Sequence, residues 1–486
     1  MTTTRHAGNL GKDWAANEFG ESEFGDSRLN VRLVNLANSF IESPQSPINQ
    51  SCKFWHESKA AYRFFKNDKV TAKRILAPHI RQTVMRAAQD PTVLVIQDTS
   101  YISYAGHRKT KGLGIIRSEY QGAAQGLVMH TSFAVNSEGI PLGIVDQNIF
   151  SRQLMSKAKK ALRKKSGGTR LLLEEKESIR WLNGVRNTVD SFRDSKTKVV
   201  TVCDREGDFY DLYKFSQEIN TSVLIRASSD RRINKSVRRS RLPEDKLWGL
   251  LSRQPCQGKI VLELPPKADR QARAAHLEIR FSPLTMNPPT NYYFQVNNGK
   301  KKTYPKLNAI YVKEVGAPKG EAPLEWMLLT DLEVTNIHQA LEKIKWYTYR
   351  WRIEIFHKIL KSGLHVEKCR LNTADRLKRY LTLMSVIAWR LYWITLINRA
   401  TPKMPCTCLI TERQWKLLYL QIHKNRTLPK TTPSIREVTR WIAQLGGFLA
   451  RKGDGEPGII TIWRGWKRLF DLSAGCASAN RFKICG

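Results

Sequence analysis

Three carboxylates in this sequence are placed where they could share a metal ion. Asp98 follows a β-branched run at 93–96, and Asp204 follows another at 199–202, so each is expected to end a strand. Carboxylates at the C-terminal ends of strands in an α/β sheet face the crevice where ligands bind. Asp is also frequent in turns, so either residue alone could be a turn or cap residue. Together with Glu354, they supply the oxygen ligands that Mg²⁺ prefers, for one or two ions.

Glu354 belongs to a segment that is predicted to be a buried helix with one polar stripe. At 100° per residue, Tyr347, Arg350, Glu354 and Lys361 fall within about 60° of one another, and most of the remaining surface is apolar. Such a helix is buried, so the stripe is expected to face an internal site or a ligand. The alternative is a purely structural ion pair between Arg350 and Glu354, which are spaced i, i+4. Beside the carboxylates, the cations Arg350 and Lys361 fit a phosphate.

Two further acids, Glu206 and Asp208, lie close to Asp204 and are alternative ligands. The helix expected after this strand would instead turn them toward solvent. Two motifs of other catalytic classes are absent: the sequence has no G-x-x-x-x-G-K-[ST] and no H-E-x-x-H. A nucleotide-hydrolysing motor is therefore disfavoured, and no nucleotide cofactor is expected.

The charge composition indicates a polyanionic partner. The 486 residues include 81 Lys and Arg against 43 Asp and Glu, which gives a net charge of +38 at pH 7, more than solubility requires. With 41% hydrophobic residues and 13 Trp, the chain is expected to form folded domains. Nucleic acid is favoured over a membrane, because the longest apolar stretch, 381–397, is interrupted by Arg390 and is typical of a buried helix.

Three segments are the candidates for phosphate contact. The run 157–170 contains no acid, and the run 226–241 contains only Asp230. Lys and Arg in such runs can neutralise a phosphate backbone and release counterions. The third segment is the basic and aromatic N-terminal region, whose aromatic residues could equally be core residues, as the basic runs could be solvated loops. The individual candidates are Arg28, Arg32, Arg63, Arg226 and Arg231.

The N-terminus contains no apolar segment of the signal-peptide type, so a cytoplasmic location is expected. The eight cysteines are then expected to be reduced. They include no C-x-x-C pair and are interpreted as packing residues rather than zinc ligands.

The elements that must position these residues follow the order βββαβαβ. An antiparallel meander at the start and strands alternating with helices afterwards predict an α/β sheet with an antiparallel edge. The expected strands are 93–96, 131–135, 140–145, 199–202 and 223–225, and the helices are 174–189 and 209–219.

Helical segments are predicted on both sides of this sheet. Residues 12–90 have the pattern of a small helical module, in which Asp26 and Thr71 are N-caps. Prolines break the α/β order between 230 and 325, where the runs 260–264, 277–281 and 292–296 predict an inserted β-rich subdomain. Helices are expected again from Ile337, and nearly everything after Thr373 is expected to be helical, with a turn at Leu445-Gly-Gly-Phe448.

These residues resemble bacterial cut-and-paste DDE transposases of the insertion-sequence-four group, most closely those of the Tn-five type. The segment 347–361 matches that group's Y-x2-R-x3-E-x6-K signature at every named position. Ile96-Gln-Asp98-Thr is similar to its first aspartate strand, and Val202-Cys-Asp204-Arg-Glu to its second. Further similarity lies at Trp14, 25–28, 60–64, 175–178, 323–326 and 445–448.

The resemblance implies an RNase H-like core that holds one metal triad, Asp98, Asp204 and Glu354. It implies a DNA-binding domain over 1–75, a catalytic domain over 76–371 with the β-rich insertion at about 230–325, and a helical dimerisation domain over 372–486. Tyr347, Arg350 and Lys361 would hold backbone phosphates beside a flipped base, and Trp326 would stack on that base. Two Mg²⁺ ions, replaceable by Mn²⁺, would serve each active site.

The expected function is DNA transposition. Its partners would be double-stranded DNA, as element ends and target, and a second copy of the chain in a synaptic homodimer, with no membrane. The location would be the bacterial cytoplasm, at the nucleoid. Two alternatives remain: a catalytically silent DNA-binding regulator, and a metal-dependent nuclease that does not join strands.

Overall fold

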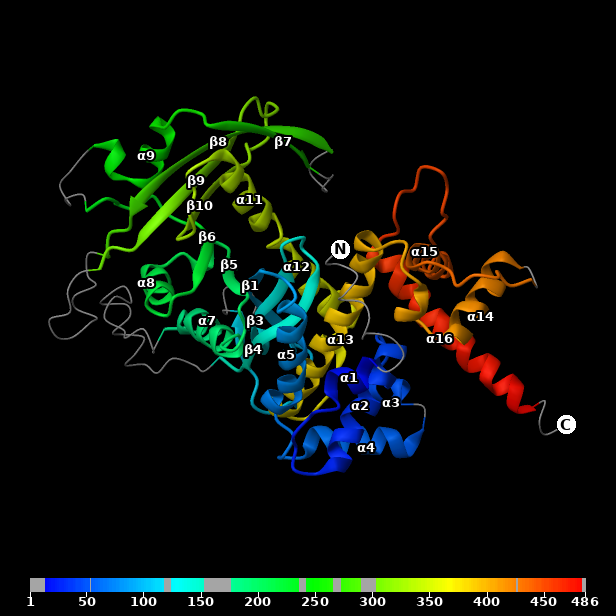
Figure 1. The fold of residues 1–486 in the computed structure, drawn as a ribbon. Coiled ribbons are helices and arrows are strands. Elements are labelled where there is room, and N and C mark those ends of the chain that lie inside the picture. Colours follow the sequence, from blue (N-terminus) through cyan, green and yellow to red (C-terminus); the bar gives the residue numbers. More distant parts are fainter. Residues whose placement is uncertain are drawn as a thin grey trace.

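The chain folds around one long mixed sheet, with helices from both chain ends packed beside it (Figure 1). The computed structural model describes residues 14–52, 54–117, 124–152, 176–235, 242–264, 272–289, 303–424 and 427–482. The strands are β1 (Thr92–Ser103), β2 (Gly114–Arg117), β3 (Ala124–Asn136), β4 (Pro141–Phe150), β5 (Lys198–Cys203), β6 (Ser222–Arg226), β7 (Gly258–Leu264), β8 (Arg273–Thr285), β9 (Lys306–Glu314) and β10 (Glu325–Thr330).

The sheet begins as predicted. β1, β3 and β4 form an antiparallel meander, and β1, β5 and β6 are parallel neighbours. The helices α7 (Ile179–Ser191) and α8 (Tyr210–Glu218) occupy the predicted positions between the parallel strands. The short strand β2, which was not predicted, pairs with β3 at the edge.

The position of Asp98 in its strand differs from the prediction. β1 does not end at Asp98 but continues to Ser103, because it stays paired with β3 over its whole second half. The parallel ladder between β1 and β5 stops one residue earlier, at Gln97 opposite Cys203. Asp98 is therefore at the end of the parallel pairing, although it is in the middle of a strand.

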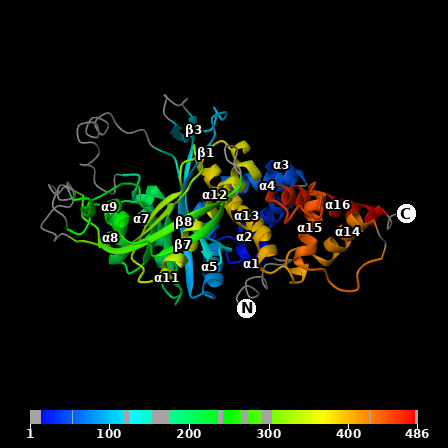
Figure 2. The same cartoon turned by 90° about the horizontal axis from the view of Figure 1, so that it is seen from above.

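The β-rich segment continues the same sheet. β10 pairs with β6, and β9, β8 and β7 follow in that order, so the sheet has ten strands. β7 and β8 contain the predicted runs 260–264 and 277–281, whereas 292–296 lies outside the described residues. β9 was not predicted. The short helix α9 (Leu247–Arg253) precedes these strands, and Figure 2 shows α9 toward the end of the molecule opposite the C-terminus.

The N-terminal helical module was predicted correctly, with both caps. The Asp26 side chain accepts the N–H of Arg28 at 3.0 Å, and Thr71 accepts that of Arg74 at 3.2 Å. The helices are α1 (Trp14–Phe19), α2 (Ser27–Glu42), α3 (Ile48–Ser51), α4 (Trp55–Lys66) and α5 (Ala72–Ala87).

A buried ion pair joins this module to the sheet. Glu18 of α1 accepts two hydrogen bonds from Arg86 of α5, both at 3.0 Å, and one from His79 Nδ1. Nε2 of His79 accepts the backbone N–H of Ile144 in β4 at 2.9 Å, so the imidazole is neutral and Arg86 is the cation that balances Glu18. Burial alone would raise the pKa of Glu18, but its partners lower it to about 2.

The segment expected to be one helix from 346 to 361 has three parts. α11 (Ile337–Thr348) ends before Arg350, α12 (Trp351–Lys358) carries Glu354, and a π-helical turn covers Ile359–Gly363. Hydrogen bonds from the N–H of Tyr349 and of Arg350 to carbonyls three residues earlier tighten the first junction. π-turns often occur at functional sites, and here the two irregularities bracket Glu354.

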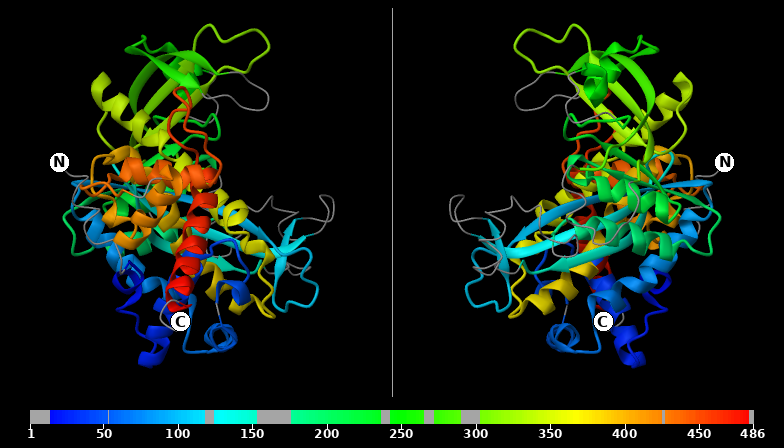
Figure 3. Two further views of the ribbon diagram at one scale, coloured as in Figure 1. Left: turned by 90° about the vertical axis from the view of Figure 1, so that its right-hand side faces the viewer. Right: turned by 90° about the vertical axis from the view of Figure 1, so that its left-hand side faces the viewer.

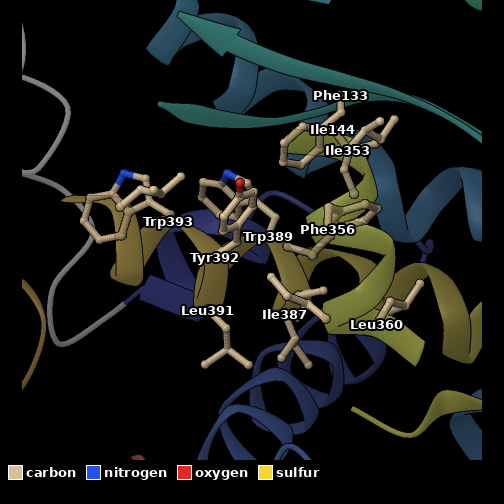
Figure 4. Close-up of a cluster of buried hydrophobic side chains, with 14 of the residues drawn as sticks. Phe133, Ile144, Ile353, Phe356, Leu360, Ile387, Trp389, Leu391, Tyr392 and Trp393 are labelled. Atoms are coloured by element: carbon tan, nitrogen blue, oxygen red, sulfur yellow. The ribbon is translucent and has the colours of Figure 1, made fainter. Parts of the chain in front are cut away.

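α12 is not buried on every side as expected, because Trp351 is 49% exposed. Figure 4 shows Phe356 between the sheet and the long helix α13 (Ala374–Ala400). The rings of Phe356 and Phe133 of β3 stack with centroids 4.9 Å apart, and Tyr392 of α13 stacks on Phe133. This packing fixes the helix that carries Glu354 against β3.

α13 contains the apolar stretch expected to be a buried helix. It is long and apolar enough to cross a membrane, but its whole apolar window is buried inside the fold, which confirms a core helix. After it come α14 (Glu412–His423), α15 (Ile435–Leu445) and α16 (Ile459–Phe482), as the helical prediction requires. Gly447 follows α15 with φ +97°, in the predicted turn. α16 packs on α2, where Trp466 Nε1 donates to the carbonyl of Ile41 at 3.2 Å (Figure 3).

Candidate active site

The two aspartates are brought together by the pairing of β1 with β5. Gln97 and Cys203 are partners in this parallel ladder, and the next residue of each segment is Asp98 and Asp204, respectively. Asp204 caps the 3₁₀ turn Arg205–Gly207, where its side chain accepts the N–H of Glu206 at 2.8 Å. The strand order thus does what the sequence pattern predicted for these two residues.

The two carboxylates interact electrostatically. Burial raises the pKa of Asp204, and the charge of Asp98 raises it further, against the opposing effect of the Glu206 N–H. Burial would also raise the pKa of Asp98, but its hydrogen bond with His357, together with the charges of His357 and Arg350, lowers it. Bringing these two anions together in a half-buried place is unfavourable unless a cation balances them.

Arg350 connects Glu354 to the two aspartates. Arg350 Nη2 donates to Glu354 Oε1 at 2.6 Å, so the i, i+4 ion pair that was the structural alternative is present. The guanidinium is buried, and its charge contributes to the lowered pKa of Asp98 and opposes the rise in the pKa of Asp204. One buried cation therefore interacts with all three carboxylates of the predicted triad.

The donor chemistry of this site fits a divalent cation. Asp98 and Asp204 are close enough to interact electrostatically, and carboxylate oxygens are the ligand type that Mg²⁺ takes. Within the described ranges, no group of three or more His, Cys, Asp or Glu side chains is gathered closely enough to hold a metal ion. Glu354 instead faces Arg350, so it would have to exchange that partner to become a third ligand.

Tyr347 and Trp326 form a buried aromatic pair beside this site. Trp326 of β10 is 9% exposed and packs edge-to-face on Tyr347, with ring centroids 5.6 Å apart. Burial raises the pKa of Tyr347, while the charges of Arg350 and Arg226 oppose the rise. Arg226, at the end of β6, donates to the carbonyl of Glu325 at 2.8 Å. These four predicted residues are thus brought together, with the ring of Trp326 largely covered.

Lys361 lies in the π-helical turn. Burial lowers the pKa of its amine, and the negative charges of Glu367 and Asp98 oppose this. Its charge therefore interacts with Asp98 of the predicted triad.

The sequence prediction missed His357. Its Nδ1 is 3.5 Å from Asp98 Oδ2, and the side chain is 8% exposed. The spacing Glu354-x-x-His357 places both residues on one face of a helix, which could have identified it.

The expectation that Asp208 turns toward solvent is wrong. Asp208 is buried and accepts from Tyr213 Oη at 2.9 Å and from the N–H of Ser228 at 2.6 Å. It also forms an ion pair with Arg231. Arg231 was predicted to contact DNA, and here its guanidinium binds Asp208. Glu206, by contrast, keeps a side chain that is 56% exposed.

The N-terminal candidates lie mainly on the surface. Arg63 is exposed, Arg32 is half-buried, and Arg28 is exposed and pairs with Asp26 at 3.0 Å. Trp55 of α4 is 78% exposed beside the basic residues of that helix. The run 157–170, and 236–241 of the second run, lie outside the described residues.

Family models match both ends of the chain. Residues 11–70 match a model described as transposase DNA-binding, and residues 386–486 match one described as the transposase Tn5 dimerisation domain. The first match covers α1 to α4, and the second covers most of α13 and all of α14 to α16. These domains support DNA and a second copy of the chain as partners. A transposase DNA-binding domain at one end and a Tn5 dimerisation domain at the other support the assignment of this chain as a Tn5-like transposase.

Proposed function

We propose that this chain binds the inverted ends of its own mobile element, cuts them by metal-dependent hydrolysis through a hairpin intermediate, and joins the freed 3′ ends to target DNA. The observation that carries the proposal is the meeting of Asp98, Asp204 and the Arg350–Glu354 pair between β1, β5 and α12. The parallel strands β1, β5 and β6 with an antiparallel extension are compatible with an RNase H-like core.

Asp98 and Asp204 would hold the metal, with Glu354 as the third ligand once it leaves Arg350. When bound there, Mg²⁺ or Mn²⁺ would activate the attacking oxygen and stabilise the leaving oxygen, which is the chemistry that two ions supply in phosphoryl transfer. Arg350 and Lys361 would neutralise the phosphates that approach this site. A guanidinium matches two phosphate oxygens at once, so Arg350 would also orient the scissile strand.

The reaction sequence needs no covalent protein intermediate and no nucleotide. A water oxygen attacks a phosphorus at the element's end and leaves a free 3′-hydroxyl. That hydroxyl attacks the opposite strand and closes a hairpin, a second water opens the hairpin, and the 3′-hydroxyl then attacks target DNA. Each step exchanges one phosphorus–oxygen bond for another.

The test is an incubation of the full chain with Mg²⁺ and labelled DNA that carries the element's own end. On a denaturing gel, a transposase of this type gives nicked strands, then a snap-back product about twice the length of one strand, and joined products once target DNA is added. A nuclease without joining gives nicks or blunt breaks alone. A silent regulator shifts the DNA in a native gel and leaves every strand intact.

A further inference from the structure

A buried arginine on α7, Arg180, contacts the segments that follow both aspartates. Its Nε donates to Thr99 Oγ1 at 3.1 Å, and Thr99 is the residue after Asp98. Its Nη2 is 3.6 Å from Glu206 Oε2, and the N–H of Glu206 is bound by Asp204. The Arg180 side chain is 9% exposed.

The remaining nitrogen of Arg180 is engaged as well. Nη1 donates to the carbonyl of Glu177 at 2.9 Å and lies 3.4 Å from its Oε2. Glu177 is itself held by Arg152, whose Nε and Nη2 donate to its two oxygens at 2.6 and 2.8 Å. Positive and negative side chains therefore alternate along the series Arg152, Glu177, Arg180 and Glu206.

Helix stability does not explain a cation at this position. Arg180 is the second residue of α7, and a positive charge in the first turn opposes the helix dipole. That turn contains no acidic residue, and the N-cap Ser178 makes no side-chain cap. Burying a guanidinium there is costly unless its donors are satisfied, and its partners lie beside Asp98 and Asp204.

The residue on the other side of Asp98 is also held by α7. With its amide oriented to satisfy its neighbours, Gln97 donates to the Trp181 carbonyl at 3.2 Å and accepts the Val185 N–H at 3.0 Å. Gly184 leaves room for this contact, because a Cβ there would lie 2.8 Å from a terminal atom of the Gln97 amide. Both chain neighbours of Asp98 are therefore fixed from α7.

We propose that Arg180 is a positioning residue that fixes Asp98 relative to Asp204 by binding Thr99 and Glu206. This rests on the metal-binding role of the two aspartates under the proposed function. Only the planar fork of arginine reaches three such partners at once, so lysine would be a partial replacement. Residues that orient metal ligands from behind typically contribute 10- to 100-fold to metal affinity or activity.

The experiment compares the wild type with Arg180→Gln and Arg180→Lys. Arg193→Gln is the matched control. Arg193 follows the end of α7, is 75% exposed and pairs with Asp190 of that helix. Three quantities are measured on the full chain with end DNA: the Mg²⁺ concentration for half-maximal nicking, the Mn²⁺ dissociation constant by electron paramagnetic resonance, and DNA affinity without metal.

Arg180→Gln should raise both the Mg²⁺ concentration for half-maximal nicking and the Mn²⁺ dissociation constant by about 10- to 100-fold. Its DNA affinity and melting temperature should stay near those of the wild type. The metal dependence of Arg180→Lys should lie between those of the wild type and Arg180→Gln, and that of Arg193→Gln should match the wild type. Unchanged metal dependence in Arg180→Gln overturns the proposal, and so does an equal loss of DNA affinity, metal affinity and thermal stability.

If Arg180→Gln does not fold, the proposal is tested with Thr99→Val and Glu206→Gln, singly and combined. Removing both should weaken Mn²⁺ binding as Arg180→Gln is expected to do, and unchanged binding overturns the proposal. If the wild type binds Mn²⁺ but never nicks end DNA, only the proposed function is contradicted. The Mn²⁺ affinities of the wild type and the Arg180 variants still test the role of Arg180.

Discussion

Arg350 and Glu354 form an ion pair of 2.6 Å at the point where α11 gives way to α12. The charge of the same guanidinium contributes to the lowered pKa of Asp98 and opposes the rise in the pKa of Asp204, so it acts on three carboxylates at once. The structural and functional interpretations of this pair are therefore compatible. Arg350 holds the site together without metal, and its exchange of Glu354 for phosphate would free a ligand when DNA and metal arrive.

The first prediction concerns the origin of DNA affinity. If the charge of +38 serves phosphate contact, raising salt from 50 to 200 mM should weaken end binding by roughly 10³- to 10⁵-fold for six to ten contacts. If Arg63 contacts a phosphate, Arg63→Gln should lower the slope of log K against log salt by about one. Fluorescence anisotropy across a salt series measures both, and a nearly flat slope would show that the charge has another purpose.

The second prediction concerns Trp326. Flipping a base out of the stack costs a few kcal/mol, and stacking it on an aromatic ring returns about 1–3 kcal/mol. Trp326→Ala should therefore leave the first nick unchanged and slow hairpin formation by about 5- to 150-fold, so that nicked DNA accumulates. Trp326→Phe should retain most of the hairpin rate.

Because Trp326 is 9% exposed against Tyr347, its ring must move to receive a base. Met327→Ala is the control for lost core volume, since Met327 is buried on the opposite face of β10. Equal loss of nicking and hairpin formation in Trp326→Ala would assign Trp326 to the core alone.

The third prediction concerns acid stability. Glu18→Gln leaves Arg86 buried without its counter-charge, which should cost about 3–5 kcal/mol of unfolding free energy at pH 7. Because the pKa of Glu18 is lowered from 4.5 to about 2, its stabilisation is complete above pH 4.5 and is lost as the pH falls through about 2. The difference between the wild type and Glu18→Gln should therefore shrink toward pH 2.

Urea unfolding at pH 7 and at the lowest pH where the chain stays folded measures this difference. Glu21→Gln is the control, because Glu21 is 72% exposed and pairs with Arg81. A stability difference that stays constant with pH would contradict the role of the buried ion pair.

Local patterns predicted the sheet better than the helix at 346–361. β-branched runs located β1, β5 and β6, because buried parallel strands need such residues. The stripe of Tyr347, Arg350, Glu354 and Lys361 predicted the candidate site, but ideal helical angles could not show the tightened turn before α12 or the π-turn after it. Those irregularities depend on packing against β3 and α13, which no local pattern contains.

Contacts between residues far apart in the chain could not be predicted from the sequence for the same reason. Trp326 was compatible with a strand core or a base platform, and only the fold shows Tyr347 against it. Asp208 was expected in solvent because a helix follows its strand, and its partners Ser228 and Arg231, about twenty residues further along the chain, could not be foreseen. Arg180 carried no motif for its link to Thr99 and Glu206.

The most direct test of the central claim is Mg²⁺-dependent nicking of end DNA by Asp98→Asn, Asp204→Asn and Glu354→Gln, beside the exposed control Asp190→Asn on α7. Each of the three variants should still shift end DNA in a native gel and nick it at less than about a thousandth of the wild-type rate, while the control nicks normally. Nicking at the wild-type rate by any one of the three would remove that residue from the triad and contradict the account.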